Sequence, residues 1–232
     1  MVALIVLAIW LAIALGFGID MMKRAQSGAL DFAPIVHLHV LAYTGWLVLL
    51  AAQVWLVRTR RLAIHKRLGW AAAVLIPAML VTGPFTAYAG VAGNPYMPDK
   101  WISWLSVNYT NAIGSIVLLT AGLLMRRNAA AHKRLMVMGT IAVTEPGFSR
   151  IWMEFLEARV GDGYVGFYIS TYIGTLLLVI AVGAYDVATR RRLLPAYIAA
   201  ALWILANQAL ADWLFHQPFW LAAMKQMTGH SA

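Results

Sequence analysis

Long apolar runs, separated by short polar segments, follow one another along the whole chain. A run of about 18 or more apolar residues can cross a bilayer as a helix, because about 20 residues at a rise of about 1.5 Å span a hydrocarbon core of about 30 Å. The alternating strands of about 10 residues that a membrane barrel needs are not seen. The pattern predicts an all-α bundle of seven transmembrane helices, at residues 2–20, 34–57, 69–90, 106–125, 135–157, 166–188 and 195–216.

A short basic phrase recurs between these runs, at residues 60–68, at 126–135 and, in a weaker form, at 190–195. The loops that contain the three copies hold 12 of the 18 lysines and arginines. Cytoplasmic loops carry an excess of Lys and Arg, so all three loops are expected in the cytoplasm. The N-terminus is then cytoplasmic and the C-terminus periplasmic. Each basic loop closes one of three helical hairpins, and the first helix is the odd one.

Composition supports this plan. The chain is 62% hydrophobic and 12% charged, which is too apolar for a soluble domain of 232 residues. The formal charge of +9 lies mostly in the loops that set topology, so we exclude nucleic acid as a partner and expect the lipid bilayer instead. Residues 1–232 are predicted to form a single integral membrane domain. The chain has no cysteine, which excludes disulfides and cysteine-bound zinc or iron–sulfur centres.

Polar residues within the predicted helices are the candidates for chemistry, because burying them in hydrocarbon is costly unless they pair. The second helix carries His37 and His39, which lie about 200° apart on a helix, so they cannot both face one site. His39 shares a stripe with Tyr43, Trp46 and Gln53 and is predicted to point inward. The alternative is a histidine pair that anchors the helix end at the interface.

The fifth predicted helix carries Glu145 and Pro146 roughly ten residues from its cytoplasmic end, near the middle of the bilayer. Pro146 removes a backbone hydrogen bond and is expected to kink the helix. Arg150 is expected to pair with Glu154, Glu145 or Asp212. The alternative is a half-buried helix with water beside it.

The seventh predicted helix carries Gln208, Asp212 and His216 on one face, at spacings of four residues. An aspartate four residues before a histidine can accept its ring N–H and raise the basicity of the other nitrogen. Such an arrangement is typical of a ligating or proton-transferring histidine. A simple hydrogen bond at the helix end is the alternative.

These groups predict a polar cavity that faces the periplasm. Its expected lining is His39, Glu145, Arg150, Asp212 and His216. Within it, Glu145, Arg150 and Asp212 are the candidate catalytic residues. A metal is expected to bind the ligands His37, His39 and His216.

Two further histidines, His65 and His132, belong to the repeated cytoplasmic loops. They are candidate haem ligands, or members of basic clusters that contact lipid phosphates, and the second interpretation is favoured. If His39 pairs with His216 outside and His65 pairs with His132 inside, the chain has the ligands of a transmembrane di-haem electron carrier.

The residues around these histidines resemble a group of uncharacterised bacterial polytopic membrane proteins. In that group a histidine-bearing helix precedes a His-(Arg/Lys)-Arg-Leu-Gly loop. The second copy is similar to small membrane proteins suspected of roles in cytochrome oxidase assembly, but has Met136 where the glycine would be. The resemblance implies a bacterial inner membrane and haem or copper. It is carried by His37, Leu38, His39, Gly45, Trp46, Gln53, Arg60, Arg61, His65–Gly69 and His132–Met136.

Three functions are compatible with these observations. The first is a redox or electron-transfer protein that uses haem b or a transition metal, and a membrane enzyme with a lipophilic substrate overlaps with it. The second is an accessory or assembly subunit of a respiratory complex, with a quinone or a respiratory-complex protein as partner. The third is a transporter of protons or small solutes, for which a buried glutamate beside a proline break is typical.

Overall fold

The computed structural model describes residues 1–231, which fold into helices with no strand among them. The all-α class is confirmed. The elements are α1 (Val2–Gln26), α2 (Pro34–Arg58), α3 (Leu62–Leu68), the 3-10 turn η1 (Gly69–Ala71), α4 (Ala72–Ala92), α5 (Asp99–Ser103), α6 (Leu105–Leu124), α7 (Ala129–Ala142), α8 (Glu145–Val160), α9 (Tyr164–Arg190), α10 (Pro195–Phe215) and α11 (Pro218–Thr228).

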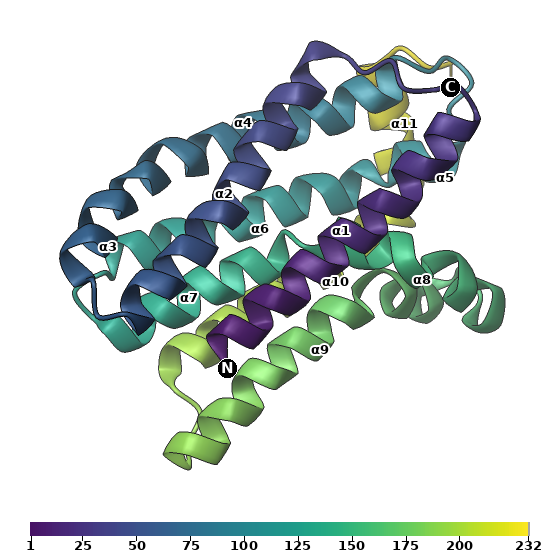
Figure 1. The fold of residues 1–232 in the computed structure, drawn as a ribbon. Coiled ribbons are helices and arrows are strands. Elements are labelled where there is room, and N and C mark those ends of the chain that lie inside the picture. Colours follow the sequence, from purple (N-terminus) through teal and green to yellow (C-terminus); the bar gives the residue numbers. More distant parts are fainter. Residues whose placement is uncertain (232) are drawn as a thin grey trace.

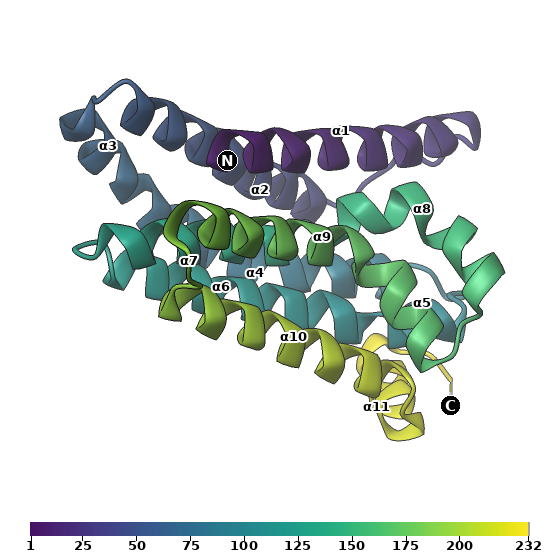
Figure 2. The same ribbon diagram turned by 90° about the horizontal axis from the view of Figure 1, so that it is seen from below.

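The long helices run side by side along one direction (Figure 1). Figure 2 shows α1 and α2 on one side of the bundle and α10 on the other, with α4, α6, α7 and α9 between them. The neighbours that pack most closely are α6 with α7, α8 with α9, α2 with α4, and α1 with α8. The first residue lies toward one end of the bundle, and α11 lies at the other (Figure 1).

Six segments within residues 1–231 are long and apolar enough to cross a membrane: Val2–Gln26, Pro34–Arg58, Leu62–Ala92, Asp99–Leu124, Tyr164–Arg190 and Pro195–Phe215. They overlap six of the seven predicted spans. Many of their large apolar side chains are exposed, for example Leu4, Val74 and Leu202. Exposed apolar faces of this extent are stable against lipid and not against water. The protein is therefore a multi-pass membrane protein surrounded by a bilayer.

The predicted span 135–157 is wrong as one continuous helix. The chain forms α7 and then α8, with a break at residues 143 and 144. The ring of a helical proline clashes with the carbonyl four residues earlier, which for Pro146 is that of Ala142, and α7 ends there. With 14 residues, α7 is about 21 Å long and cannot cross a core of about 30 Å. Six continuous spans and one broken segment replace the seven expected spans.

The largest of three apolar clusters joins the long helices. Its fully buried members include Trp46, Met79, Leu119, Met138 and Ile141. The indole Nε1 of Trp46 donates to Oγ1 of Thr140 at 3.1 Å, which satisfies the only polar atom of that side chain and ties α2 to α7.

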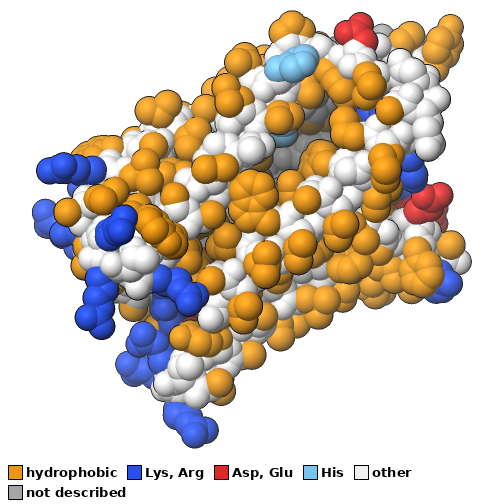
Figure 3. Space-filling model, in the orientation of Figure 1, with side chains coloured by type: hydrophobic (Ala, Val, Ile, Leu, Met, Phe, Trp, Pro, Cys, Tyr) orange, Lys and Arg blue, Asp and Glu red, His pale blue; other side chains and the backbone are white. Residues whose placement is uncertain are grey.

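The two ends of the bundle differ in charge. Lysine and arginine gather at the end formed by α3, the start of α7 and the end of α9 (Figure 3), which we call the basic end. It includes the three loops that the basic phrases predicted. The opposite end is formed by α5, α11 and the last turns of α8. There α11, which follows the last predicted span, packs on α5 through a bond from Trp220 Nε1 to the carbonyl of Ser103 at 3.1 Å.

Candidate functional site

The first residue of α8, Glu145, lies at the helix break and is 1% exposed. Its Oε2 accepts a hydrogen bond from Nδ2 of Asn111 on α6 at 3.2 Å. Its Oε1 makes no hydrogen bond of good geometry within residues 1–231, although the hydroxyl of Ser149 is close enough to act on the carboxyl group. A buried polar atom without a partner is rare in proteins and often marks a site that binds water or a ligand. Glu145 is thus half satisfied by the fold.

One turn further along α8, Arg150 turns away from Glu145 toward α1. Its Nη1 donates to the carbonyl of Pro146 at 2.8 Å, and its guanidinium lies 4.3 Å from the centre of the Phe17 ring. Its Nε lies 3.9 Å from Oδ2 of Asp20. Asp20 was not among the partners expected from the sequence. The charge of Arg150 still reaches the carboxyl of Glu145 and the ring of His39.

An open cavity of about 470 Å³ lies between α1, α5 and α8 at the end opposite to the basic end. We call it the charged vestibule. Ser149 and Arg150 belong to its wall, one turn beyond Glu145. Its other charged residues are Asp20, Lys23, Lys100, Glu154 and Glu157. Lys100 Nζ and Glu157 Oε2 pair across it at 2.6 Å.

Further buried hydroxyl groups lie within the bundle, on α6 and α9. Ser106, Thr171 and Tyr172 are 0% exposed, and their hydroxyl oxygens have no hydrogen-bond partner in the described part of the chain. The hydroxyl of Tyr172 lies within electrostatic range of the carboxyl groups of both Glu145 and Asp212. Hydroxyls both donate and accept hydrogen bonds, so each of these groups keeps unused hydrogen-bonding capacity inside the bundle.

The two histidines of α2 have different surroundings. His37 is exposed, whereas His39 is partly buried. The ring of His39 lies 4.1 Å from that of Tyr43, and its Nδ1 is buried without a partner among residues 1–231. Figure 3 shows a hollow in the surface between α1 and α2, with histidine on its α2 side.

The residues Asp212 and His216 lie elsewhere, at the end of α10. Nδ1 of His216 lies 2.8 Å from the carbonyl oxygen of Asp212 and 3.2 Å from its carboxylate, and the carbonyl contact has the better hydrogen-bond geometry. Nε2 lies 3.3 Å from the carbonyl oxygen of Asp162, and the ring stacks on Tyr164. Both nitrogens of His216 therefore face main-chain oxygens, which leaves no lone pair directed at a ligand.

The five residues expected to line one cavity are therefore not together. They are divided between the region of the vestibule, the α2 side of the bundle and the end of α10. Arg150 lines the charged vestibule, Glu145 lies behind it, and His39 lies on the α2 side. Asp212 and His216 lie at the end of α10 and do not line the vestibule. Gln208 lies one turn before Asp212 on α10, and its Oε1 accepts a hydrogen bond from the hydroxyl of Tyr168 at 3.0 Å.

The metal ligands expected from the sequence are not assembled. Within residues 1–231 there is no group of three or more His, Cys, Asp or Glu side chains placed to hold a metal ion. His37 is on the exposed side of α2, and His216 is bound to main-chain oxygens. The structure does not bring His37, His39 and His216 together, and metal binding by this set stays a prediction.

The structure does bring His65 and His132 together. Their ring centres are 6.3 Å apart and the ring planes are nearly perpendicular, at 83°. Nδ1 of His132 lies 2.8 Å from the carbonyl oxygen of Gly122. The sequence offered two histidine pairs, and in the described structure this is the one whose rings are in contact. The favoured interpretation of its histidines had been clusters that contact lipid phosphates.

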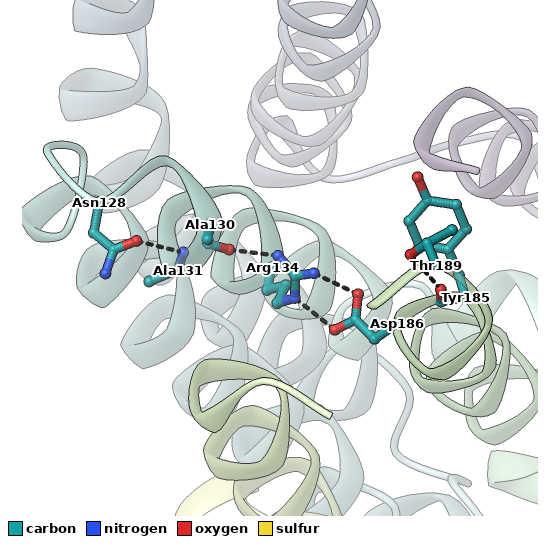
Figure 4. Close-up of polar contacts among 7 residues, drawn as sticks. All are labelled: Asn128, Ala130, Ala131, Arg134, Tyr185, Asp186 and Thr189. Carbon is teal, nitrogen blue, oxygen red and sulfur yellow. Dashed lines mark hydrogen bonds and ion pairs between the residues drawn. The ribbon is translucent and has the colours of Figure 1, made fainter. Parts of the chain in front are cut away.

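One polar contact was missed in the sequence. Arg134 donates through Nε to Oδ2 of Asp186 at 2.6 Å and through a second nitrogen to Oδ1, and both side chains are almost fully buried (Figure 4). Asp186 is the only acidic residue near the three basic loops. A single acid among many bases indicates an ion pair, and this feature of the sequence could have predicted the contact.

Comparison with protein-family models, with curated proteins and with solved structures gives no match. The function is therefore inferred from the geometry of the side chains. The resemblance to proteins suspected in cytochrome oxidase assembly stays a prediction.

Proposed function

We propose that the protein is a proton transporter in which Glu145 binds the proton that enters through the charged vestibule. The observation that carries this proposal is the carboxyl oxygen of Glu145 that has no partner, buried one turn behind the vestibule wall. Ionisable groups buried in membrane proteins are costly to keep and typically serve transport paths.

The break between α7 and α8 supports the proposal. Non-helical backbone at membrane depth is tolerated only where it is buried in protein or lines a water-filled cavity. Many transporters place their binding sites at such interrupted helices. Here the interruption places Glu145 at the start of α8, one turn from the vestibule wall and within electrostatic range of the Tyr172 hydroxyl.

The vestibule favours a proton over a larger ion. Its charged residues include three acids and three bases, so its net charge selects neither cations nor anions. The groups beyond it are a carboxyl and hydroxyls, which both accept and donate protons. On the other side of Glu145, the apolar core of Trp46, Met138 and Ile141 closes the bundle toward the basic end. We infer that the structure is open to the outer side and closed to the inner side.

The orientation follows from charge. The basic end is inside, so the vestibule faces outside, which for a bacterial inner membrane is the periplasm. The N-terminus is then cytoplasmic and the C-terminus periplasmic.

The test is proton flux into liposomes that contain the purified protein, followed with a trapped pH-sensitive dye under a membrane potential. Wild-type protein is expected to conduct protons, and Glu145→Gln is expected to abolish the flux. The control is Asp31→Asn, the same loss of a carboxylate at an exposed side chain that does not line the vestibule. It should retain flux. Wild-type liposomes that leak no more than protein-free liposomes would refute the proposal.

A redox role with haem b is the second candidate, and the contact between His65 and His132 is the observation that favours it. The outer pair does not fit a haem, because both nitrogens of His216 face carbonyl oxygens. The absorption spectrum of protein purified from haem-supplemented cells tests this role. A Soret band that is lost in His132→Ala would support it, and its absence in wild type would exclude it. The proposal of a quinone or a respiratory-complex protein as a partner depends on this redox role.

A further inference from the structure

The two main copies of the repeated basic phrase meet at the basic end through their histidines. His65 lies on α3 and His132 on α7, with ring centres 6.3 Å apart. Two imidazoles that bind one ion from opposite sides, each through a metal–nitrogen bond of about 2.0–2.1 Å, have ring centres about 6 Å apart. The observed spacing therefore matches a pair of ligands to a single ion.

Each of the two histidines has a ring nitrogen that is free to bind a ligand. Nδ1 of His132 faces the carbonyl oxygen of Gly122 at 2.8 Å, and since a carbonyl cannot donate, Nδ1 carries the proton. Nε2 of His132 then has its lone pair available. A bond from the other ring nitrogen to a carbonyl is the usual support of a metal-binding histidine. His65 has a buried Nδ1 without a partner within residues 1–231.

A third donor lies one turn along α7. Met136 follows His132 by four residues, so both side chains lie on the same face of the helix. The sulfur of Met136 lies 2.7 Å from the position that a Cβ on residue 122 would occupy. The thioether therefore packs against Gly122, whose carbonyl orients His132. In the first copy of the phrase, Gly69 stands where Met136 stands in the second.

The surroundings select the kind of ion. Lys66 is close enough to act on His65 electrostatically, and Asp186, the acid at this end, is paired with Arg134. A divalent cation is disfavoured where its neighbours are positive and its ligands are neutral. A thioether is a soft donor that selects Cu(I), and imidazole also binds copper. We propose that His65 and His132 bind one Cu(I) ion at the basic end, with Met136 as the third ligand.

This site is independent of Glu145. The test titrates purified wild-type protein with Cu(I) under reducing conditions in competition with a chromophoric Cu(I) chelator. One ion per chain is expected. His65→Asn and His132→Asn should each weaken binding by more than the roughly 10–100-fold that is typical for loss of an outer-shell partner. Met136→Leu, which removes the sulfur and keeps the volume, should weaken Cu(I) binding less.

The matched control is His37→Asn, an exposed histidine far along α2, and it should bind like wild type. X-ray absorption of the wild-type complex supplies a readout that needs no variant, and two imidazole ligands are expected. The proposal is overturned if wild type binds no stoichiometric Cu(I), if absorption shows fewer than two imidazoles, or if Zn²⁺ displaces Cu(I). A Soret band that depends on His65 would assign the pair to haem and overturn it as well.

Discussion

Arg134 on α7 and Asp186 on α9 form a buried ion pair at the basic end. Nε of Arg134 donates to Oδ2 of Asp186 at 2.6 Å, a second nitrogen donates to Oδ1, and Nη1 donates to the carbonyl of Ala130 at 2.8 Å (Figure 4). The side chains are 2% and 1% exposed. Each charge is therefore stable in this place only because the other is present.

We expect Asp186→Asn to lower the free energy of unfolding by about 3–5 kcal/mol, because it leaves the guanidinium buried without a counter-charge. The double variant Arg134→Met with Asp186→Leu should recover most of this loss, since an apolar pair of similar volume avoids the cost of burying two charges. Denaturant-induced unfolding in detergent micelles, followed by tryptophan fluorescence, measures both.

The control for this prediction is an exposed pair. Lys23 and Glu154 lie 3.7 Å apart, with side chains that are 68% and 93% exposed. Lys23→Met should change stability by less than about 1 kcal/mol, because water screens such pairs. Equal losses from the buried and exposed pairs would contradict the assignment of Arg134 and Asp186 as a structural anchor.

The number of spans was predictable only in part. Six spans are visible in the sequence because each contains a long apolar run, and α4 continues as one helix through Pro77 and Pro84. The run 135–157 looks the same, but Pro146 ends α7 instead of kinking it. A proline in an apolar run is compatible with a kink or with a break. The choice depends on what packs beside it, and here Gly147 allows α1 to approach closely.

The sequence allowed us to predict which residues are candidates for the site, but not which side chains contact one another. Helical periodicity indicated that His37 and His39 face different directions, and the structure places them so. Periodicity could not show that His216 turns its ring to the carbonyl of Asp162, which lies in the turn between α8 and α9. Nor could it show that Arg150 contacts Asp20, because that contact depends on how α1 packs against α8.

The helices α1 and α8 approach each other most closely at two glycines. A Cβ on Gly16 would lie 2.1 Å from the carbonyl oxygen of Gly147. We expect Gly16→Ala to lower stability by about 1–3 kcal/mol, because the clash is with backbone and can be relieved only by moving a helix. Thermal unfolding in detergent measures the change.

Gly18, on the same helix, is the matched control. A Cβ there meets no atom within 4 Å. Gly18→Ala should be neutral or stabilising by up to about 1 kcal/mol, because alanine is the better helix former. If the two alanine variants have the same stability, the contact between α1 and α8 does not hold these helices together.

The orientation in the membrane can be tested by labelling single introduced cysteines. The chain has no cysteine of its own, so no other position reacts with the label. Tyr96 is 90% exposed at the end opposite to the basic end, and Arg192 is exposed at the basic end. We expect Tyr96→Cys to react with a membrane-impermeant maleimide in intact bacterial cells. Arg192→Cys should react only after the inner membrane is permeabilised. The reverse pattern would place the basic end outside and the vestibule inside.

Stability and transport should respond differently at Glu145. Glutamine has the same shape, can accept the bond from Asn111 through its own carbonyl oxygen, and carries no charge to bury. We expect Glu145→Gln to unfold at the same or a higher denaturant concentration than wild type while it loses proton flux, as is common where a group is retained for function at a cost in stability. Asn111→Leu removes the same contact from the other side and should cost about 1–3 kcal/mol, because Oε2 of Glu145 is then left buried without a donor. A large loss of stability in Glu145→Gln would instead show that the carboxyl group supports the fold, and the loss of flux in that variant would no longer count as evidence for a proton site.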